Sequence, residues 1–245
     1  MTKDIDYSIY YNRWHKDSVE HFEEVAKTYG RLLNTLIESI PSSAKILDYG
    51  CGSGLLTYFL KKRFEYVIGV DASSQQVNVA KTMGLPVELL SVDDFSQWCE
   101  SKIQSFDVVF LFDVLEHIPV ISQIEFMRKL VRTLKTHGEI YIKVPNANSL
   151  LAAIWRYNDW THHSSFTECS LDFVCLNSGL TDLQYLDDES SLKPRLAWVP
   201  RWGLRRYYVK ALSRKLWKIY LKSELGAQAD AIKVGYNLFL RARKA

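Results

Sequence analysis

The sequence predicts an α/β fold in which a mostly parallel sheet is covered by helices on both faces. Between residues 44 and 144, short apolar runs alternate with segments of helical periodicity, which is the pattern of such a sheet. A glycine-rich stretch, Gly50 to Gly54, joins the first apolar run to the first helical segment. The 245 residues, 47% of them hydrophobic, are enough to bury the core of one such domain.

The elements of the sheet follow one another in a regular order. Strands are expected near residues 45–48, 66–71, 87–91, 106–112 and 138–144, with helices near 54–63, 73–82, 94–102 and 121–135. Gly138 follows the last of these helices and is interpreted as its C-terminal stop. Two later runs, 182–187 and 233–243, are predicted to complete the sheet as an antiparallel edge hairpin. The prediction is therefore a seven-stranded, mostly parallel sheet with an antiparallel last strand.

An additional helix is expected ahead of the sheet. Apolar residues recur at spacings of three and four through residues 16–39, as in Phe22, Val25, Tyr29 and Leu33. Residues 1–15 are rich in tyrosine and either pack on the domain as an arm or close over a bound ligand as a lid.

These patterns divide the chain into three parts. Residues 1–40 form an N-terminal arm and helix with a possible lid function. Residues 41–189 and 233–245 form the core, in which residues 146–180 are an irregular loop on the acceptor side. Residues 190–232 form a helical insertion.

Composition excludes several classes of protein. The net charge is only +3 and no RNA- or DNA-reading module is recognised, so no nucleic acid partner is expected. The four cysteines show no zinc-ligand spacing. The sequence has neither the apolar core of a signal peptide nor a membrane-spanning run. We expect a cytoplasmic protein, with a peripheral location at the inner membrane face left open.

The glycine stretch indicates the kind of ligand. Glycine lets a backbone take positive φ and approach a ligand closely. Here the spacing is G-x-G-x-G, with Asp48 two residues ahead of the first glycine. A carboxylate at this position would repel a pyrophosphate and attract an ammonium group. The loop therefore predicts a cationic nucleoside cofactor that carries no phosphate.

Three segments carry a family resemblance. Asp48-x-Gly50-x-Gly52-x-Gly54 resembles motif I of the Rossmann-like (class I) S-adenosylmethionine-dependent methyltransferases. Residues 67–71 and 106–117 are similar to the second and fourth strand segments of that family, and the match covers residues 40 to 150. The resemblance implies a Rossmann-like fold with S-adenosyl-L-methionine as cofactor.

The resemblance also implies which residues bind that cofactor. The methionine part is assigned to Asp48, Gly50, Cys51, Gly52 and Gly54, the ribose to Asp71 with Ala72, the adenine to Asp93 or Asp94, and a further contact to Asp113. For Asp93 and Asp94 the alternative is a helix N-cap with a first-turn carboxylate, and the two roles can coexist.

A second concentration of polar residues follows the fifth strand, from Asn158 to Thr167. If the acceptor is a hydroxyl, a general base assists methyl transfer, and histidine suits that task at neutral pH. His162 is the first candidate for the base, Asp159 for its orienting partner, and His117 is a further catalytic candidate. Residues 145–167, which include this stretch, resemble bacterial methyltransferases found with cell-surface polysaccharide biosynthesis. The alternative for His162 is a hydrogen bond that only fixes the loop.

Asp113-x-x-Glu116-His117 admits a metal-binding interpretation. At i, i+3 and i+4 the three side chains would share one helical face. The segment resembles the Glu-x-x-Glu-His element of small-RNA 2′-O-methyltransferases and ubiquinone-pathway O-methyltransferases, which is associated there with a divalent metal. Here the first ligand is one methylene shorter. We expect no resident metal and keep these three residues as candidates beside a purely structural turn.

The insertion is strongly basic, without an acidic residue from Ser190 through Ser223. Read as a helix over Leu204–Lys222, it has two stripes: an apolar one of Leu204, Tyr208, Leu212, Leu216 and Ile219, and a basic one of Arg206, Lys210, Arg214, Lys218 and Lys222, with Trp198, Trp202 and Trp217 nearby. Such a helix can lie on an anionic membrane. Alternatively it packs on the domain with its cations in solvent, or it forms a basic rim that recruits a phosphorylated acceptor.

Taken together, the sequence predicts an S-adenosylmethionine-dependent methyltransferase. The expected reaction is O-methylation of a small molecule or a glycan, with a lipid-linked or nucleotide-linked acceptor as one option. One rival is a quinone-pathway or phenolic O-methyltransferase that depends on a metal. Another is a non-catalytic module that keeps the cofactor fold and binds a membrane surface or a partner.

Overall fold

The computed structural model describes residues 18–187 and 201–245. The tyrosine-rich segment 1–15, with its arm and lid interpretations, and Trp198 lie outside the described residues. The side chains of residues 201–206 are likewise not described, so Trp202, Leu204 and Arg206 are placed only by their helix.

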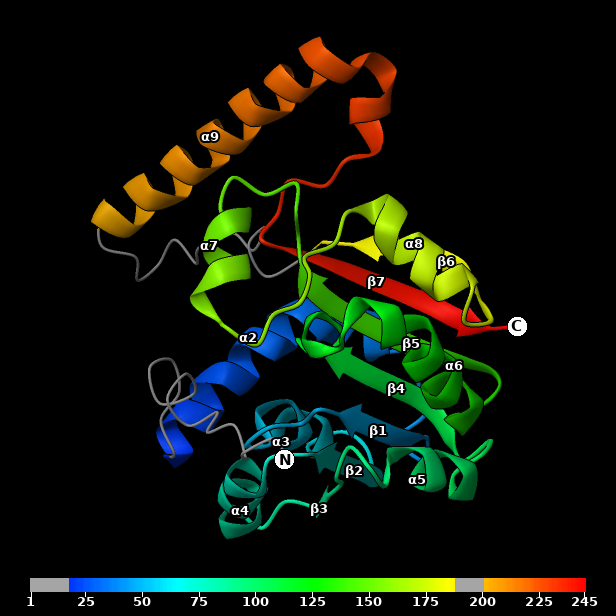
Figure 1. Cartoon of the computed structure of the whole chain (residues 1–245). Coiled ribbons are helices and arrows are strands. Elements are labelled where there is room, and N and C mark those ends of the chain that lie inside the picture. Colours follow the sequence, from blue (N-terminus) through cyan, green and yellow to red (C-terminus); the bar gives the residue numbers. More distant parts are fainter. Residues whose placement is uncertain (1–17, 188–200) are drawn as a thin grey trace.

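The strands form one seven-stranded sheet of order β3-β2-β1-β4-β5-β7-β6 (Figure 1). β7 runs antiparallel to both of its neighbours, while the other neighbouring strands pair in parallel. The predicted sheet and its antiparallel last strand are therefore confirmed. The bounds are β1 Lys45–Tyr49, β2 Tyr66–Asp71, β3 Val87–Leu89, β4 Phe106–Phe112, β5 Leu134–Pro145, β6 Leu180–Leu186 and β7 Asn237–Lys244.

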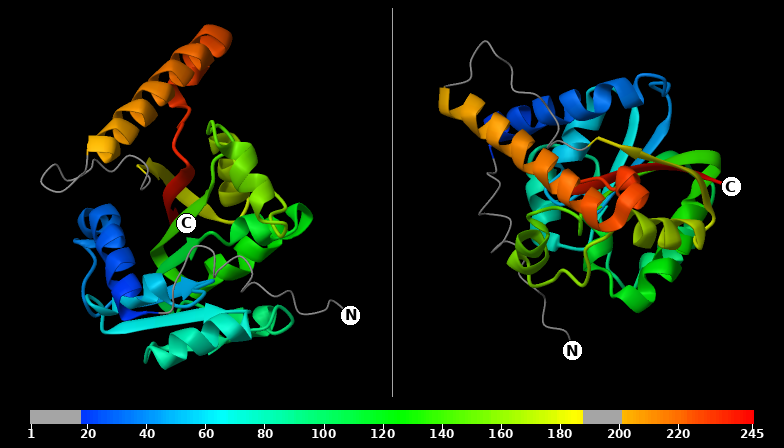
Figure 2. Two further views of the ribbon diagram at one scale, coloured as in Figure 1. Left: turned by 90° about the vertical axis from the view of Figure 1, so that its left-hand side faces the viewer. Right: turned by 90° about the horizontal axis from the view of Figure 1, so that it is seen from above.

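Helices cover both faces of this sheet (Figure 2). Alternate residues of a strand point to opposite faces, and in β4 Val109 packs with the first cluster of core residues while Phe110 packs with the second. The first cluster includes residues of α5, α6 and α8, and the second includes residues of α2 and α3. The helix bounds are α2 Val19–Ile37, α3 Leu55–Lys61, α4 Ser74–Thr82, α5 Phe95–Ser101, α6 Gln123–Thr133, α7 Ala152–Asn158 and α8 Glu168–Leu176.

One predicted helix end is wrong. α6 ends at Thr133, and Gly138 lies inside β5 rather than at a helix terminus. The pairing of β5 with β4 shifts register between Phe106 and Val108, opposite this part of β5. A Cβ on Gly138 would come within 3.0 Å of the Lys135 carbonyl oxygen and 3.1 Å of that of Asp107. Gly138 therefore permits the close approach of two backbones at an irregular point in the ladder.

The predicted loop 146–180 contains two helices, α7 and α8. α8 begins with a capping box in which the side chains of Thr167 and Ser170 each bond the other's backbone N–H. Its buried residues Leu171, Val174 and Cys175 have helical spacing. This helical spacing is present in the sequence. It was not recognised because α8 is short and polar residues surround its apolar positions.

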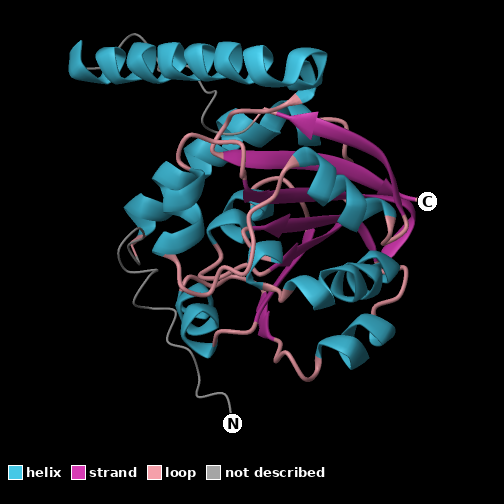
Figure 3. Cartoon of the chain, turned by 45° about the horizontal axis from the view of Figure 1, so that its top comes forward, coloured by secondary structure: helices cyan, strands magenta, loops and turns pink. Residues whose placement is uncertain are grey.

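The insertion forms the helix α9 (Arg201–Leu225), followed by a 3-10 turn, η5 (Gly226–Ala231). Figure 3 shows α9 lying along one side of the molecule, apart from the sheet. Arg214 lies over the ring of Tyr236 at 4.7 Å, and Lys218 Nζ donates to the carbonyl oxygen of Asp230 at 3.2 Å. The middle of the basic stripe thus faces the domain, so the expectation of a solvated cationic face is wrong there.

Among the helices of residues 18–187 and 201–245, none combines the length and the hydrophobicity that a membrane span requires.

Candidate active site

The loop after β1 has a fixed shape. Gly50, Gly52 and Gly54 all have positive φ, and a Cβ on Gly50 would lie 2.2 Å from Cγ2 of Val114. A Cβ on Gly52 would meet nothing nearer than Gln76 Oε1 at 3.8 Å. The glycines therefore let one side of the loop close against its neighbours, while the backbone at Gly52 stays open to a ligand.

Asp71, at the end of β2, braces this loop. Its Oδ2 accepts from the backbone N–H of Gly52 at 2.8 Å, and its Oδ1 accepts from that of Ser73 at 2.8 Å. Burial raises the pKa of this carboxyl, although these N–H groups oppose the rise. Each oxygen still has a lone pair for another donor. The geometry suits a carboxylate that holds the loop and binds a pair of hydroxyls. Ala72 beside it is exposed.

Asp48 lies inside β1 and not at the mouth of the loop, because only 2% of its surface is exposed. Its Oδ2 accepts a 2.6 Å hydrogen bond from Thr57 Oγ1 of α3. Burial raises the pKa of Asp48 to about 7, and the negative charge of Asp71 adds to the rise. Cys51 is a buried thiol beside the loop. Asp48 is thus a buried group that would ionise more readily beside a cation.

The two aspartates after β3, Asp93 and Asp94, differ in their hydrogen bonding. Asp94 occupies the N-cap position of α5 but makes no side-chain capping bond; its Oδ2 accepts from Ser91 Oγ at 2.6 Å. Asp93 is exposed. The carboxyl ends of parallel strands meet at one edge of the sheet, where ligands bind in open α/β folds. Asp93 is therefore available at that edge, and its role toward adenine stays a prediction.

The predicted helical face of Asp113, Glu116 and His117 is wrong. After β4 the chain forms a 3-10 turn, η1 (Leu115–His117), and Asp113 precedes it with a φ of +56°. Asp113 Oδ2 instead pairs with Lys143 Nζ at 2.7 Å. Since the segment is not an α-helix, the spacing i, i+3, i+4 does not align the three side chains.

A different trio meets here: one ligand atom from each of Glu116, His117 and His162 lies within 4.8 Å of the other two. The rings of His117 and His162 contact each other edge to face, with centroids 4.6 Å apart. Glu116 is 1% exposed, and its Oε2 has no hydrogen-bond partner among the residues described. The two segments that carry the catalytic candidates therefore converge.

Hydrogen bonds set the tautomers of both imidazoles. Thr161 Oγ1 donates to Asp159 Oδ1 at 2.6 Å, so it must accept from His117 Nδ1, which lies 2.8 Å away. His162 Nδ1 donates to the carbonyl oxygen of Trp155 at 2.9 Å. In each ring the proton therefore sits on Nδ1, and Nε2 keeps its lone pair.

Burial disfavours the charged form of each group in this cluster. It lowers the pKa of His117 to about 4, and the neighbouring His162 lowers it further. Burial also lowers the pKa of His162, against the pull of Asp159, whose Oδ2 lies 3.9 Å from His162 Nε2. The pKa of Glu116 is raised well above its usual range by burial and by the charge of Asp113. Two Nε2 atoms with lone pairs thus stand beside a buried carboxyl group whose protonated form is favoured by its surroundings.

Most of the chain matches one known protein family. Residues 20–185 match the model of a family described as "Methyltransferase domain". The chain belongs to the methyltransferase domain family. The resemblance and the Rossmann-like fold predicted from the sequence are thereby confirmed.

This chain is similar to several curated proteins over part of its length. It is 31% identical over 116 residues to the "Ubiquinone biosynthesis O-methyltransferase" of Hahella chejuensis, a match covering 45% of this chain and 48% of that one. The Glaesserella parasuis protein of the same name is 27% identical over 55% of this chain and 66% of its own. The chain thus spans about half the length of the first of these curated relatives.

Solved structures show the same fold. A SAM-dependent methyltransferase from Archaeoglobus fulgidus superposes with a TM-score of 0.63 at 19% identity, covering 91% of this chain and 94% of that one. A Thermotoga maritima protein described as a possible histamine N-methyltransferase gives 0.58 at 15% identity, covering 98% of each chain. At these identities the likeness concerns the fold.

The methyltransferase's own residues fit the cofactor S-adenosyl-L-methionine. Gly52 presents open backbone, Asp71 offers two carboxylate oxygens, and Asp48 is a buried acid behind the loop. When bound, this cofactor supplies an activated methyl group. No phosphate-binding feature is needed at this loop, in agreement with the carboxyl groups around it.

Sequence reasoning missed three residues of this methyltransferase that order the site. Thr161 links His117 to Asp159. Gln123 Nε2 donates to the carbonyl oxygens of Leu115 and Ile118 and to Ser164 Oγ, and so joins η1 to the loop before α8. Lys143 holds Asp113. Of these three residues, only Thr161 could have been found from the sequence, because it lies between the two catalytic candidates Asp159 and His162.

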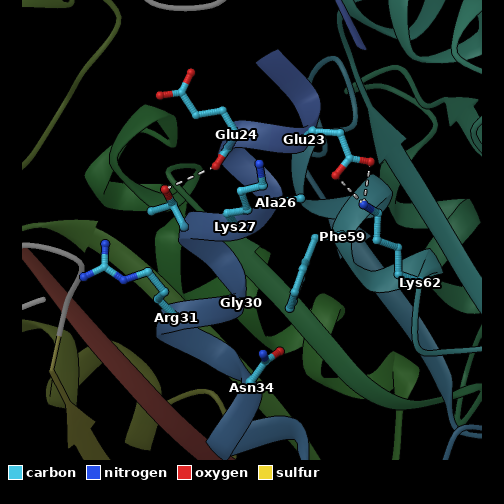
Figure 4. Close-up of a pocket in the computed structure, with 10 residues that line it drawn as sticks. Glu23, Glu24, Ala26, Lys27, Gly30, Arg31, Asn34, Phe59 and Lys62 are labelled. Carbon is cyan, nitrogen blue, oxygen red and sulfur yellow. Dashed lines mark hydrogen bonds and ion pairs between the residues drawn. The ribbon is translucent and has the colours of Figure 1, made fainter. Parts of the chain in front are cut away.

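The surface groove of about 650 Å³ in Figure 4 is separate from this site. It lies along α2, beside Phe59 of α3 and the C-cap residue Lys62, and Lys62 Nζ pairs there with Glu23 at 2.7 Å. No predicted cofactor or catalytic residue lines it.

The raised pKa of Asp48 gives the first prediction. If ionised Asp48 attracts the cofactor's ammonium group, cofactor affinity should increase from pH 6 to pH 8. Below the pKa of about 7 the carboxyl must lose its proton on binding, so the affinity should change by up to about tenfold per pH unit there. Calorimetric titration with S-adenosylhomocysteine across this range measures the effect.

The Asp48→Asn variant is the control. It keeps a side-chain oxygen for Thr57 but cannot ionise, so its affinity should be weaker and should lose the part of the pH dependence due to this residue. An equal pH dependence in the native protein and the variant would show that Asp48 does not titrate on binding.

Proposed function

We propose that this methyltransferase transfers the methyl group of S-adenosyl-L-methionine to an oxygen atom of a small-molecule or glycan acceptor. The observation that supports it most is the convergence of His117, His162 and Glu116 beyond the ends of β4 and β5. These ends lie at the same edge of the sheet as the glycine loop after β1 (Figure 1). The acceptor and the cofactor would then meet at one edge.

An oxygen acceptor suits the chemistry of this cluster. A hydroxyl must lose its proton as it is methylated, and a positioned base accelerates such a step by roughly 10²- to 10⁴-fold. His162 has a lone pair on Nε2, while its Nδ1–H is held by the carbonyl oxygen of Trp155. Asp159, 3.9 Å from Nε2, would stabilise the imidazolium formed when His162 takes the proton.

The acceptor class is the finer part of the proposal. A glycan or its lipid-linked or nucleotide-linked precursor is suggested by the resemblance in residues 145–167. In that stretch Asn146 has a structural role, because its Nδ2 donates to the backbone carbonyl oxygens of Lys233 and Gly235. The residues left to meet an acceptor are therefore those nearer His162.

We further propose a cytoplasmic location at the inner membrane face. The side of α9 that points away from the domain supports this location.

A metal-dependent phenolic O-methyltransferase is the second candidate. The specific observation in its favour is the unpartnered Oε2 of buried Glu116 beside two unprotonated imidazoles. Two nitrogens and one carboxylate oxygen fit a divalent cation, and nitrogen ligands favour manganese, iron or zinc over magnesium. The ligands would be Glu116, His117 and His162, with Asp113 replaced by His162. The curated relatives named for ubiquinone biosynthesis are consistent with a phenolic acceptor.

One assay separates the two candidates. Transfer of label from S-adenosylmethionine is measured with sugar, lipid-linked sugar and catechol acceptors, each with EDTA and with added Mn²⁺ or Mg²⁺. A metal-free base mechanism predicts turnover that EDTA leaves unchanged. A metal site predicts at least a roughly tenfold loss in EDTA that Mn²⁺ restores. Cofactor binding without turnover on any acceptor would favour the non-catalytic module.

A further inference from the structure

The outward side of α9 is apolar. Tyr208, Val209, Leu212, Leu216, Ile219 and Tyr220 are each more than half exposed. At 100° per residue these six fall within an arc of about 120°, and Lys215 lies just beyond one edge of it. We call this set the outer face of α9. A continuous apolar strip of this kind on an exposed helix needs a partner to cover it.

The opposite side of α9 fixes this orientation. Trp217 Nε1 donates to the carbonyl oxygen of Asn148 at 2.8 Å, ahead of α7. Lys218 donates to the carbonyl oxygens of Asp230 and Ile232, and Arg214 lies over Tyr236. Rotation of the helix to bury its outer face would break these contacts. The apolar strip is therefore presented outward by the packing itself.

Charge identifies the occupant. α9 carries eight basic residues and one acidic residue, Glu224. Pairing with α9 of a second copy would bring two strongly basic helices together, which like-charge repulsion disfavours. An anionic bilayer would instead receive the apolar side chains at its surface and attract the cations beside them, such as Lys215, by about 1 kcal/mol each. Arg214 and Lys218, which face the domain, and Lys222, which pairs with Asp230, contribute less. We infer that the outer face of α9 docks on an anionic lipid bilayer.

This inference deepens the proposed function and, in what it says of the acceptor, rests on it. The ring of Tyr236 lies between Arg214 of α9 and Trp155 of α7, whose ring centroid is 6.3 Å away. Trp155 in turn accepts the hydrogen bond from His162. Tyr236 and Trp155, the latter through its backbone carbonyl oxygen, therefore connect α9 to the proposed base. The corresponding acceptor class is an amphiphile that keeps its apolar part in the bilayer and offers a hydroxyl to His162.

The test is co-sedimentation of the full chain with vesicles of phosphatidylcholine, alone or mixed with phosphatidylglycerol. The native protein should pellet with the mixed vesicles and bind pure phosphatidylcholine at least roughly tenfold more weakly. Replacing Leu212 and Leu216 together by Asp should reduce binding to the mixed vesicles by roughly tenfold or more. The matched control replaces Phe173 and Leu176 of α8, which are similarly exposed, by Asp and should bind as the native protein does.

Two further measurements keep the outcome clear. Binding of S-adenosylhomocysteine to both double variants checks that they are folded. Sedimentation velocity without lipid shows whether the outer face joins two copies. The inference is overturned if the native protein does not bind anionic vesicles or if L212D/L216D binds them normally. It is also overturned if the native protein is a dimer and this variant is a monomer. Vesicle binding needs neither cofactor nor acceptor, so its failure is distinct from failure of the methyltransferase assay.

Discussion

Replacing His162 by alanine should lower turnover by roughly 10²- to 10³-fold and leave cofactor affinity nearly unchanged. His162 contacts the acceptor-side cluster, whereas the proposed cofactor residues lie in the loop after β1 and at the end of β2. Loss of the ring removes the Nε2 lone pair but leaves Asp159 bonded to Thr161. The effect should therefore appear in kcat, measured by single-turnover methyl transfer, while calorimetry reports unchanged binding of S-adenosylhomocysteine.

The neighbouring histidine provides the matched control. His163 is exposed, and it contacts Glu116 through its backbone N–H, which an alanine would keep. His163→Ala should therefore be nearly as active as the native protein. If His162→Ala turned over at the native rate, or if both variants lost activity equally, His162 would not be the base.

The pH profile adds an independent check. Burial holds the pKa of His162 below its ordinary value of 6.5. A base must be unprotonated, so native turnover should rise as the pH increases through that lowered pKa and stay level above it. His162→Ala should lack this low-pH limb. A low-pH limb centred above pH 6.5, or one that His162→Ala retains, would contradict the assignment.

Replacing Asp71 by alanine should weaken cofactor binding by roughly 10²-fold or more. The ribose contact implied by the resemblance would account for part of this loss. The structure adds a second part, because Asp71 also receives the backbone N–H groups of Gly52 and Ser73. Without the carboxylate, both N–H groups lose their acceptor and the glycine loop loses its brace.

Calorimetry with S-adenosylmethionine measures this loss. Glu88→Ala is the control, because it removes the same charge from an exposed position on β3, which pairs with β2. That variant should bind the cofactor normally. Asp71→Asn should also bind poorly, since its amide can offer only one acceptor atom to the two backbone donors. Native affinity in Asp71→Ala would remove this residue from the cofactor site.

The sheet was predictable because it rests on local patterns. Buried parallel strands leave apolar runs, and the intervening helices leave spacings of three and four, so β1 to β5 and α2 to α6 could be located from the sequence. The Gly138 error shows the limit. A glycine after a helical pattern resembles a stop, whereas here its function depends on the carbonyl oxygens of Asp107 and Lys135, which only the folded sheet brings near.

Candidate residues could be selected from the sequence, but their geometry could not. Placing His117 beside His162 requires that the turn after β4 and the segment after α7 meet, which no local spacing encodes. The same holds for α9. Its two stripes were visible in the sequence, but periodicity does not say which one faces the domain; Tyr236 and the carbonyl oxygens of Asp230 and Ile232 decide that.

The position of β7 has a consequence for biosynthesis. This strand is inserted between β5 and β6, yet it follows both of them and the whole α9 segment in the chain. While the chain is being made, the hydrogen-bonding edges that β5 and β6 will share with β7 stay unpaired until residues 237–244 leave the ribosome. Open strand edges are templates for aggregation. Newly made chains should therefore depend on chaperones until β7 is in place.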